Sequence, residues 1–63
     1  MHERERWRAI LAALQRNQIV TVRGLEAQLR SSSATIRRDL SQLEALGKLR
    51  RVHGGAENTA PGS

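Results

Sequence analysis

The sequence of 63 residues contains no cysteine, which excludes disulfide bonds and metal sites with cysteine ligands. Trp7 is the only aromatic residue. We expect it to be the largest anchor of the core rather than a surface on which bases stack. No apolar run approaches membrane-spanning length, and a start with charges of both signs is unlike a signal peptide. The two histidines, His2 and His53, lie far apart in the sequence, and no cluster of residues resembles a metal site. These absences predict a cytoplasmic protein with no metal and no cofactor.

The length allows one domain with a small core. It favours a compact three-helix or helix-plus-hairpin domain, or a segment that folds on binding. Eleven Lys and Arg residues against six Asp and Glu give a net charge of +5, and ten of the eleven are Arg, which binds phosphate and guanine with two parallel hydrogen bonds. The charge favours nucleic acid as partner, then an anionic membrane. A cationic surface that serves only solubility is the alternative.

Apolar periodicity predicts three helices, at 3–17, 22–30 and 33–46. Thr21 is the expected N-cap of the second helix, and Ser32, with Ser33 as the alternative, that of the third. Gly47 is expected to end the third helix. The predicted core stripes, in chain order, are Trp7, Ile10, Leu11 and Leu14, then Val22, Leu25 and Leu29, then Ile36, Leu40 and Leu43.

Three short segments read as strands. The β-branched run at 19–21 is too short to stand alone and needs a partner later in the chain. The segments 49–52 and 56–58 form a hairpin, and Gly54 and Gly55 permit the positive φ angles of its turn. The domain therefore covers residues 1–58, and 59–63 is expected to be a disordered linker or tail. The fold class is mostly α with a small antiparallel β-hairpin.

The helix expected at 33–46 has the layout of a DNA-reading helix. With Ile36 at zero on a helical wheel, Arg37 lies near 100°, Ser41 near 140°, Ala34 near 160° and Arg38 near 200°. Two arginines, a hydroxyl and a small residue thus point away from the core, and Arg in the major groove can recognise guanine. The alternative is a solvated charged face.

The flanking segments complete the pattern of a winged helix-turn-helix. The helix N-terminus, with the hydroxyls of Ser32 and Ser33, can hold a phosphate. The hairpin forms a basic wing, and the tip at Gly54 and Gly55 lets its backbone approach another backbone. The positive charge of the wing comes from Lys48, Arg50, Arg51 and His53.

The run 32–40, "SSATIRRDL", and the run 51–56, "RVHGGA", at this spacing resemble the N-terminal signature of the DeoR family. The resemblance covers roughly residues 6–57. Members of that family are bacterial regulators of sugar and nucleoside metabolism. The resemblance implies a winged-helix fold, a repressor that binds operator DNA, and a nucleoid-associated location. It implies DNA contacts by Ser32, Thr35, Arg37 and Arg38, and by the wing from Arg51 to Gly55.

Asp39 also matches the family, and its place beside the core stripe predicts an internal salt bridge or hydrogen bond. Three positions depart from the family pattern, namely Gly24, Glu26 and Ser31. They are expected to loosen the helix at 22–30 against the helix at 33–46. Family members continue into an effector domain that oligomerises, so we expect this chain to be a monomeric fragment of a homo-oligomer.

Three other classes of function fit the sequence less well. A winged helix can serve as a protein-interaction module without specific DNA binding, but this requires an exposed apolar face, and the face opposite the core is rich in Arg and Ser. An enzyme is not expected, because the chain offers no Ser-His-Asp, paired-carboxylate or metal-ligand arrangement. A helix bound to a membrane surface is disfavoured by the mixed charges of residues 3–17.

Overall fold

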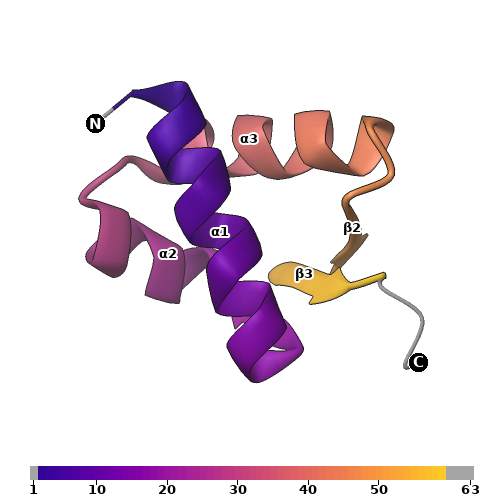
Figure 1. Ribbon diagram of the computed structural model, residues 1–63. Coiled ribbons are helices and arrows are strands. Elements are labelled where there is room, and N and C mark those ends of the chain that lie inside the picture. Colours follow the sequence, from indigo (N-terminus) through magenta and orange to yellow (C-terminus); the bar gives the residue numbers. More distant parts are fainter. Residues whose placement is uncertain (1, 60–63) are drawn as a thin grey trace.

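A computed structural model describes residues 2–59 of the chain, and in them three helices pack with a three-stranded antiparallel sheet (Figure 1). This confirms the predicted winged helix-turn-helix. Of the predicted domain, Met1 lies outside the described residues, and of the predicted tail at 59–63 only Thr59 lies within them. The elements are α1 (Glu3–Asn17), β1 (Ile19–Thr21), α2 (Val22–Leu29), α3 (Ser33–Ala45), β2 (Leu49–Val52) and β3 (Gly55–Asn58).

The starts of α2 and α3 are capped as predicted. Thr21 Oγ1 accepts a hydrogen bond from the Gly24 amide at 2.9 Å, and Ser32 Oγ accepts one from the Thr35 amide at 3.2 Å. Each cap satisfies one of the amides that a helix start leaves without an internal partner. Ser32, rather than the alternative Ser33, is therefore the N-cap of α3.

The ends of α2 and α3 come one residue earlier than predicted. Arg30 adopts the left-handed conformation, with φ 52° and ψ 43°, so α2 stops at Leu29. At the end of α3, Gly47 has a φ of 76°, and its amide bonds to the Glu44 carbonyl while the next amide bonds to that of Leu43. This pair of bonds is the Schellman motif that glycine favours, and it turns the chain from α3 into β2.

The three predicted apolar stripes meet in one core beneath the sheet. Its buried members are Ile10, Ala13, Leu14, Val20, Val22, Leu25, Leu29, Ile36, Leu40, Leu43, Leu49 and Ala56. Trp7 and Leu11 are only partly buried and pack against this core from α1. Trp7 therefore packs against the core, as expected, but is not its fully buried anchor, because a domain of this size encloses so large a side chain only in part.

The sheet has the order β1-β3-β2, so the last strand in sequence lies in the middle and supplies the partner that β1 required. β3 begins at Gly55, one residue earlier than predicted. Gly54 alone in this turn has a positive φ, 76°, which corrects the expectation for both glycines. Gly55 is needed for a different reason, because a Cβ there would lie 2.0 Å from the carbonyl oxygen of Val20 in the neighbouring strand.

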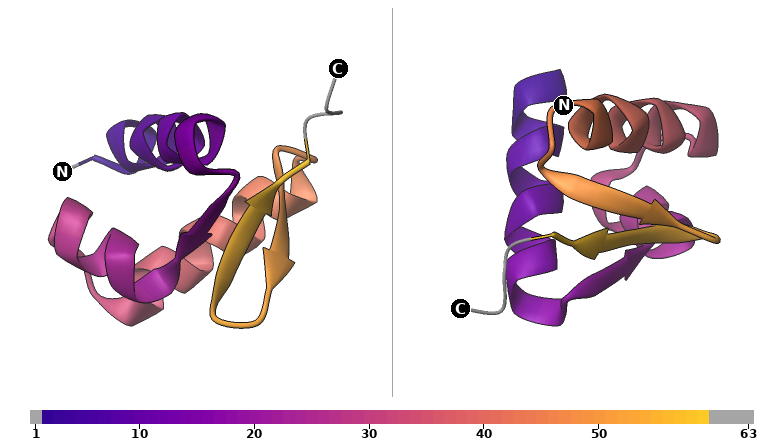
Figure 2. Two further views of the ribbon diagram at one scale, coloured as in Figure 1. Left: turned by 90° about the horizontal axis from the view of Figure 1, so that it is seen from below. Right: turned by 90° about the vertical axis from the view of Figure 1, so that its right-hand side faces the viewer.

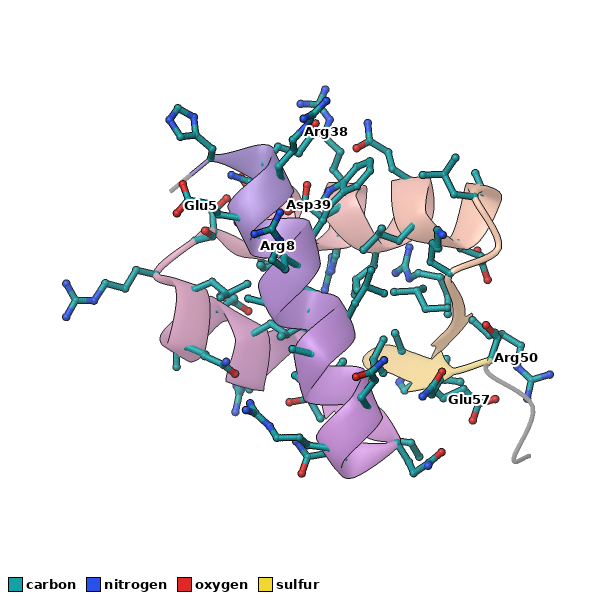
Figure 3. The ribbon with its side chains drawn as sticks, in the orientation of Figure 1. Glu5, Arg8, Arg38, Asp39, Arg50 and Glu57 are labelled. Atoms are coloured by element: carbon teal, nitrogen blue, oxygen red, sulfur yellow. The ribbon has the colours of Figure 1, made fainter. Side chains whose placement is uncertain are left out.

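A buried ion pair fixes α1 against α3, as expected for Asp39. The Asp39 carboxylate is fully buried, and it accepts hydrogen bonds from Arg6 Nε at 2.5 Å and Arg6 Nη2 at 3.2 Å. The hydrogen bond to this carboxylate raises the pKa of Arg6 above its ordinary value. Figure 3 shows Asp39 between α1 and α3. The orientation of α3 is therefore set from the side opposite its charged face.

Candidate nucleic-acid interface

The outward face of α3 carries the side chains that the helical wheel placed there. Ala34, Arg37, Arg38 and Ser41 are all exposed, while Ile36 and Leu40 are fully buried on the other side of the helix. Figure 3 shows Arg38 pointing away from the ribbon. The face thus presents two guanidinium groups and a hydroxyl within two helical turns, and the short side chain of Ala34 leaves room between them.

The first turn of α3 concentrates hydrogen-bond donors at the same end of this face. Ser32 Oγ donates to Thr35 Oγ1 at 3.0 Å, so these two hydroxyls are held together. No hydrogen bond within residues 2–59 takes up the amides of Ser33 and Ala34, the first two of the helix. These amides and the helix dipole make this end of α3 electrically positive, which suits an anionic group.

A groove of about 700 Å³ separates the start of α3 from the turn of the hairpin. It is lined by Thr21, Val22, Arg23, Glu26, Ser33, Arg37, His53 and Gly54. The Gly54 carbonyl accepts a hydrogen bond from the Val22 amide at 2.9 Å, which ties the turn to the first residue of α2. In both views of Figure 2 the turn lies on the side of the molecule away from α1. The hairpin, α2 and α3 therefore share one surface.

Four residues that line this groove were not among the predicted site residues, namely Thr21, Val22, Arg23 and Glu26, and two of them, Arg23 and Glu26, are charged. Arg23 is exposed and stands one residue after the start of α2, and Glu26 is partly buried one turn later. The sequence gives Arg23 no distinguishing pattern, because any surface helix carries such a residue. Only the return of the hairpin onto α2 brings Arg23 near His53, and a spatial relation of this kind leaves no signal in local periodicity.

The other predicted wing residues lie away from the groove. Lys48 follows the far end of α3, about 20 Å along the helix axis from Ser33 by the rise of 1.5 Å per residue. Arg50 is on the outer face of the sheet, where its guanidinium pairs with the Glu57 carboxylate, Nε donating at 2.7 Å (Figure 3). Arg51 points to the opposite face, toward α3, and Arg51 Nη1 donates to Ser41 Oγ at 2.7 Å. The basic side chains of Lys48, Arg50 and Arg51 thus lie in three different places, and none of them lines the groove.

A scan against protein-family models matches residues 6–61 to the DeoR-like helix-turn-helix domain. The chain belongs to the DeoR-like helix-turn-helix family. This confirms the resemblance seen in the sequence and makes the chain a DNA-binding domain of the kind found in transcriptional regulators.

The relatives of this DeoR-like domain are bacterial regulators. An uncharacterized HTH-type transcriptional regulator FruR of Bacillus subtilis is 44% identical over 52 residues, which are 82% of this chain and 21% of the relative. A lactose phosphotransferase system repressor of Streptococcus mutans is 38% identical over 58 residues, 92% of this chain and 23% of the relative. The regulator GolR of Listeria innocua is 46% identical over 52 residues, 82% of this chain and 20% of the relative.

The DeoR-like domain spans about a fifth of the length of the curated relatives it matches. No solved structure matches it. Among residues 2–59, no helix is both long and apolar enough to cross a membrane, and no three His, Asp or Glu side chains group as metal ligands would.

Proposed function

We propose that this DeoR-like domain binds double-stranded DNA sequence-specifically, as the DNA-binding domain of a bacterial repressor that acts in the cytoplasm at the nucleoid. The operon concerned is one of sugar or nucleoside metabolism. The names of two relatives, a lactose phosphotransferase system repressor and its namesake of Lactococcus lactis, support a sugar operon. The full-length protein carries a further effector domain through which it oligomerises, and paired domains read paired half-sites.

The observation that carries this proposal is the exposed face of α3. Arg37 and Arg38 project from the first turns of a helix whose other side is buried in the core and held by the Asp39 ion pair. A helix of this size fits the major groove, and each Arg bound to a guanine there contributes about 1–3 kcal/mol of discrimination. This face is cationic, and the helix behind it is packed in the core. A protein-interaction module would need an exposed apolar face instead, so this alternative is disfavoured.

The groove beside α3 suits the DNA backbone that borders the major groove. Arg23, Arg37 and His53 line it from three elements, and the open amides of Ser33 and Ala34 lie at its helix end. Phosphate contacts of this kind fix the register of a protein on the duplex without reading sequence. Arg23 therefore joins the predicted contacts, while Arg37 faces both the groove and the bases.

The test is a titration of labelled duplex DNA at several salt concentrations, with the preferred sequence first selected from a random library. Arg37→Ala should reduce the preference for the selected sequence by about tenfold or more, from the discrimination of one Arg–guanine pair. Arg23→Ala should weaken binding to all duplexes alike. It should also make the negative slope of log K against log salt shallower by about 0.9, because one phosphate contact is lost.

Arg16→Ala is the matched control, because it removes the same charge from the exposed last turn of α1. It should leave the sequence preference unchanged. Lys48→Ala and Arg50→Ala test the predicted contacts at the far part of the wing and should act like Arg23→Ala. Equal losses for Arg37→Ala on selected and random duplexes would contradict the assignment of α3 to base reading, and a wild-type domain without salt-dependent DNA affinity would refute the function itself.

A further inference from the structure

Arg51 of the hairpin points toward α3 and contacts its outward face at Ser41. In the register of the sheet it lies opposite Ala56, on the buried face that also carries Leu49. Its backbone amide donates to Glu44 Oε2 at 2.9 Å, and its Nη1 donates to Ser41 Oγ at 2.7 Å. The β2 strand is therefore fastened to α3 at two points one turn apart along the helix.

The guanidinium of Arg51 is otherwise poorly satisfied. Neither of the salt bridges found within residues 2–59 involves it, and its Nε is buried with no hydrogen-bond partner. An unsatisfied buried donor and a partly buried charge both cost free energy, so this side chain is not placed for stability alone. Its strong contact is directed at a hydroxyl on the DNA-facing side of α3.

The chemistry of this contact determines what Ser41 can offer to DNA. A serine hydroxyl has one donor hydrogen and two acceptor lone pairs, whereas Arg is only a donor. The bond from Arg51 therefore occupies a lone pair of Oγ and leaves the hydroxyl hydrogen free to point outward, and a charged donor strengthens the hydroxyl as a donor in turn. Ser41 lies four residues after Arg37, so both project from the same face.

We propose that Arg51 is a positioning residue for base reading, which acts by holding Ser41 as a hydrogen-bond donor, rather than a contact to the DNA backbone. The inference rests on the proposed DNA-binding function and deepens it. In the major groove guanine, adenine and thymine each present an acceptor, while cytosine presents only its N4 donor. Ser41 in this orientation therefore disfavours cytosine at the base edge that it faces.

The test uses the variants Ser41→Ala, Arg51→Ala, Arg51→Lys and the double alanine variant. Affinity is measured for the selected duplex and for every single base-pair substitution of it, at several salt concentrations. Ser41→Ala and Arg51→Ala should each lose about fivefold to tenfold of discrimination, the effect of one hydrogen bond, at the same base pair, and the double variant should lose no more. Arg51→Lys keeps the positive charge but loses the planar guanidinium, and should recover little of the base discrimination that Arg51→Ala loses.

Two readouts separate positioning from a simple charge effect. The slope of log K against log salt should stay as in the wild type for Arg51→Ala, because no phosphate contact is removed. In the DNA-free domain, NMR should find that the Arg51 Nε–H exchanges slowly with water. Ser41→Ala should speed this exchange, and because Ser41 is exposed and Ala favours helices, we expect this variant to fold.

A uniform loss on all duplexes for Arg51→Ala, with a salt dependence of log K shallower by about 0.9 than in the wild type, would overturn the inference, because it would identify a direct phosphate contact. An unchanged base preference of Ser41→Ala, in a wild-type background that keeps its preference, would overturn it as well. A wild type without any sequence preference would instead refute the proposed function on which the inference rests. If Arg51→Ala does not fold, Ser41→Ala and Arg51→Lys decide the question.

Discussion

The ion pair between Arg6 and Asp39 gives the sharpest test of how the reading helix is held. Replacing Asp39 by Ala removes the carboxylate that accepts hydrogen bonds from Arg6 Nε and Nη2, and the Arg6 side chain is only 15% exposed. The guanidinium then remains largely buried without the Asp39 carboxylate. Breaking a buried pair from one side costs about 3–5 kcal/mol. A domain of this length has a total stability of roughly 3–9 kcal/mol, so the variant should lose much of its folded population.

The free energy of unfolding is measured by urea titration, with far-UV circular dichroism for the helices. Trp7 supplies a second signal, because it is the sole tryptophan of the sequence and packs from α1 against the core, one residue after Arg6. A double variant, Arg6→Met with Asp39→Leu, removes both charges and should recover a large part of the loss. The pKa of Arg6 is raised, so the stability linked to its protonation is present below the ordinary Arg pKa and is lost as the pH rises through the raised value.

A loss below about 1 kcal/mol for Asp39→Ala would refute this reasoning, because that magnitude is typical of an exposed ion pair. Failure of the double variant to recover stability would show instead that the carboxylate has a role beyond its partner. Either result would remove the ion pair as the device that orients α3.

Four further predictions address single residues. Gly55→Ala should cost about 3 kcal/mol or more in urea unfolding, because the new Cβ would lie 2.0 Å from the Val20 carbonyl oxygen and must force β1 and β3 apart; a loss below 1 kcal/mol would contradict the close approach. Gly47→Ala should cost only about 1–2 kcal/mol, since its φ of 76° is strained for alanine but no atom lies within 4 Å; a larger loss would contradict that open space. Ser32→Ala should cost about 1 kcal/mol through the lost cap of α3, and unchanged stability would disprove the cap. Glu26→Gln should raise DNA affinity severalfold at low salt by removing a negative charge from the groove, and an unchanged affinity would place the DNA backbone elsewhere.

Local patterns predicted most of the fold. The helical stripes, the caps at Thr21 and Ser32, and the C-terminal glycine of α3 depend on residues a few positions apart, and each was found within one residue of its expected place. The partial exposure of Trp7 did not follow from the helical pattern, because the size of the core limits how much of an indole is enclosed.

The candidate site divides in the same way. That Arg37 and Arg38 face away from Ile36 follows from helical geometry alone, and the structure agrees. The roles of the wing arginines could not be separated in the same manner. Arg50 and Arg51 are adjacent in sequence, yet one pairs with Glu57 on the outer face of the sheet and the other reaches Ser41 on α3.

The sequence by itself determined the helices, their buried stripes, the positive charge and the family, because these depend on composition and on spacings within one element. Tertiary structure alone decided that β3 lies between β1 and β2, that Arg23 meets His53 across a groove, and that Asp39 is paired with Arg6. Arg23 and His53 lie 30 positions apart in the sequence, and Arg6 and Asp39 lie 33 apart. These relations arise only when the apolar stripes pack together, since burial in a common core fixes how distant surfaces are brought side by side.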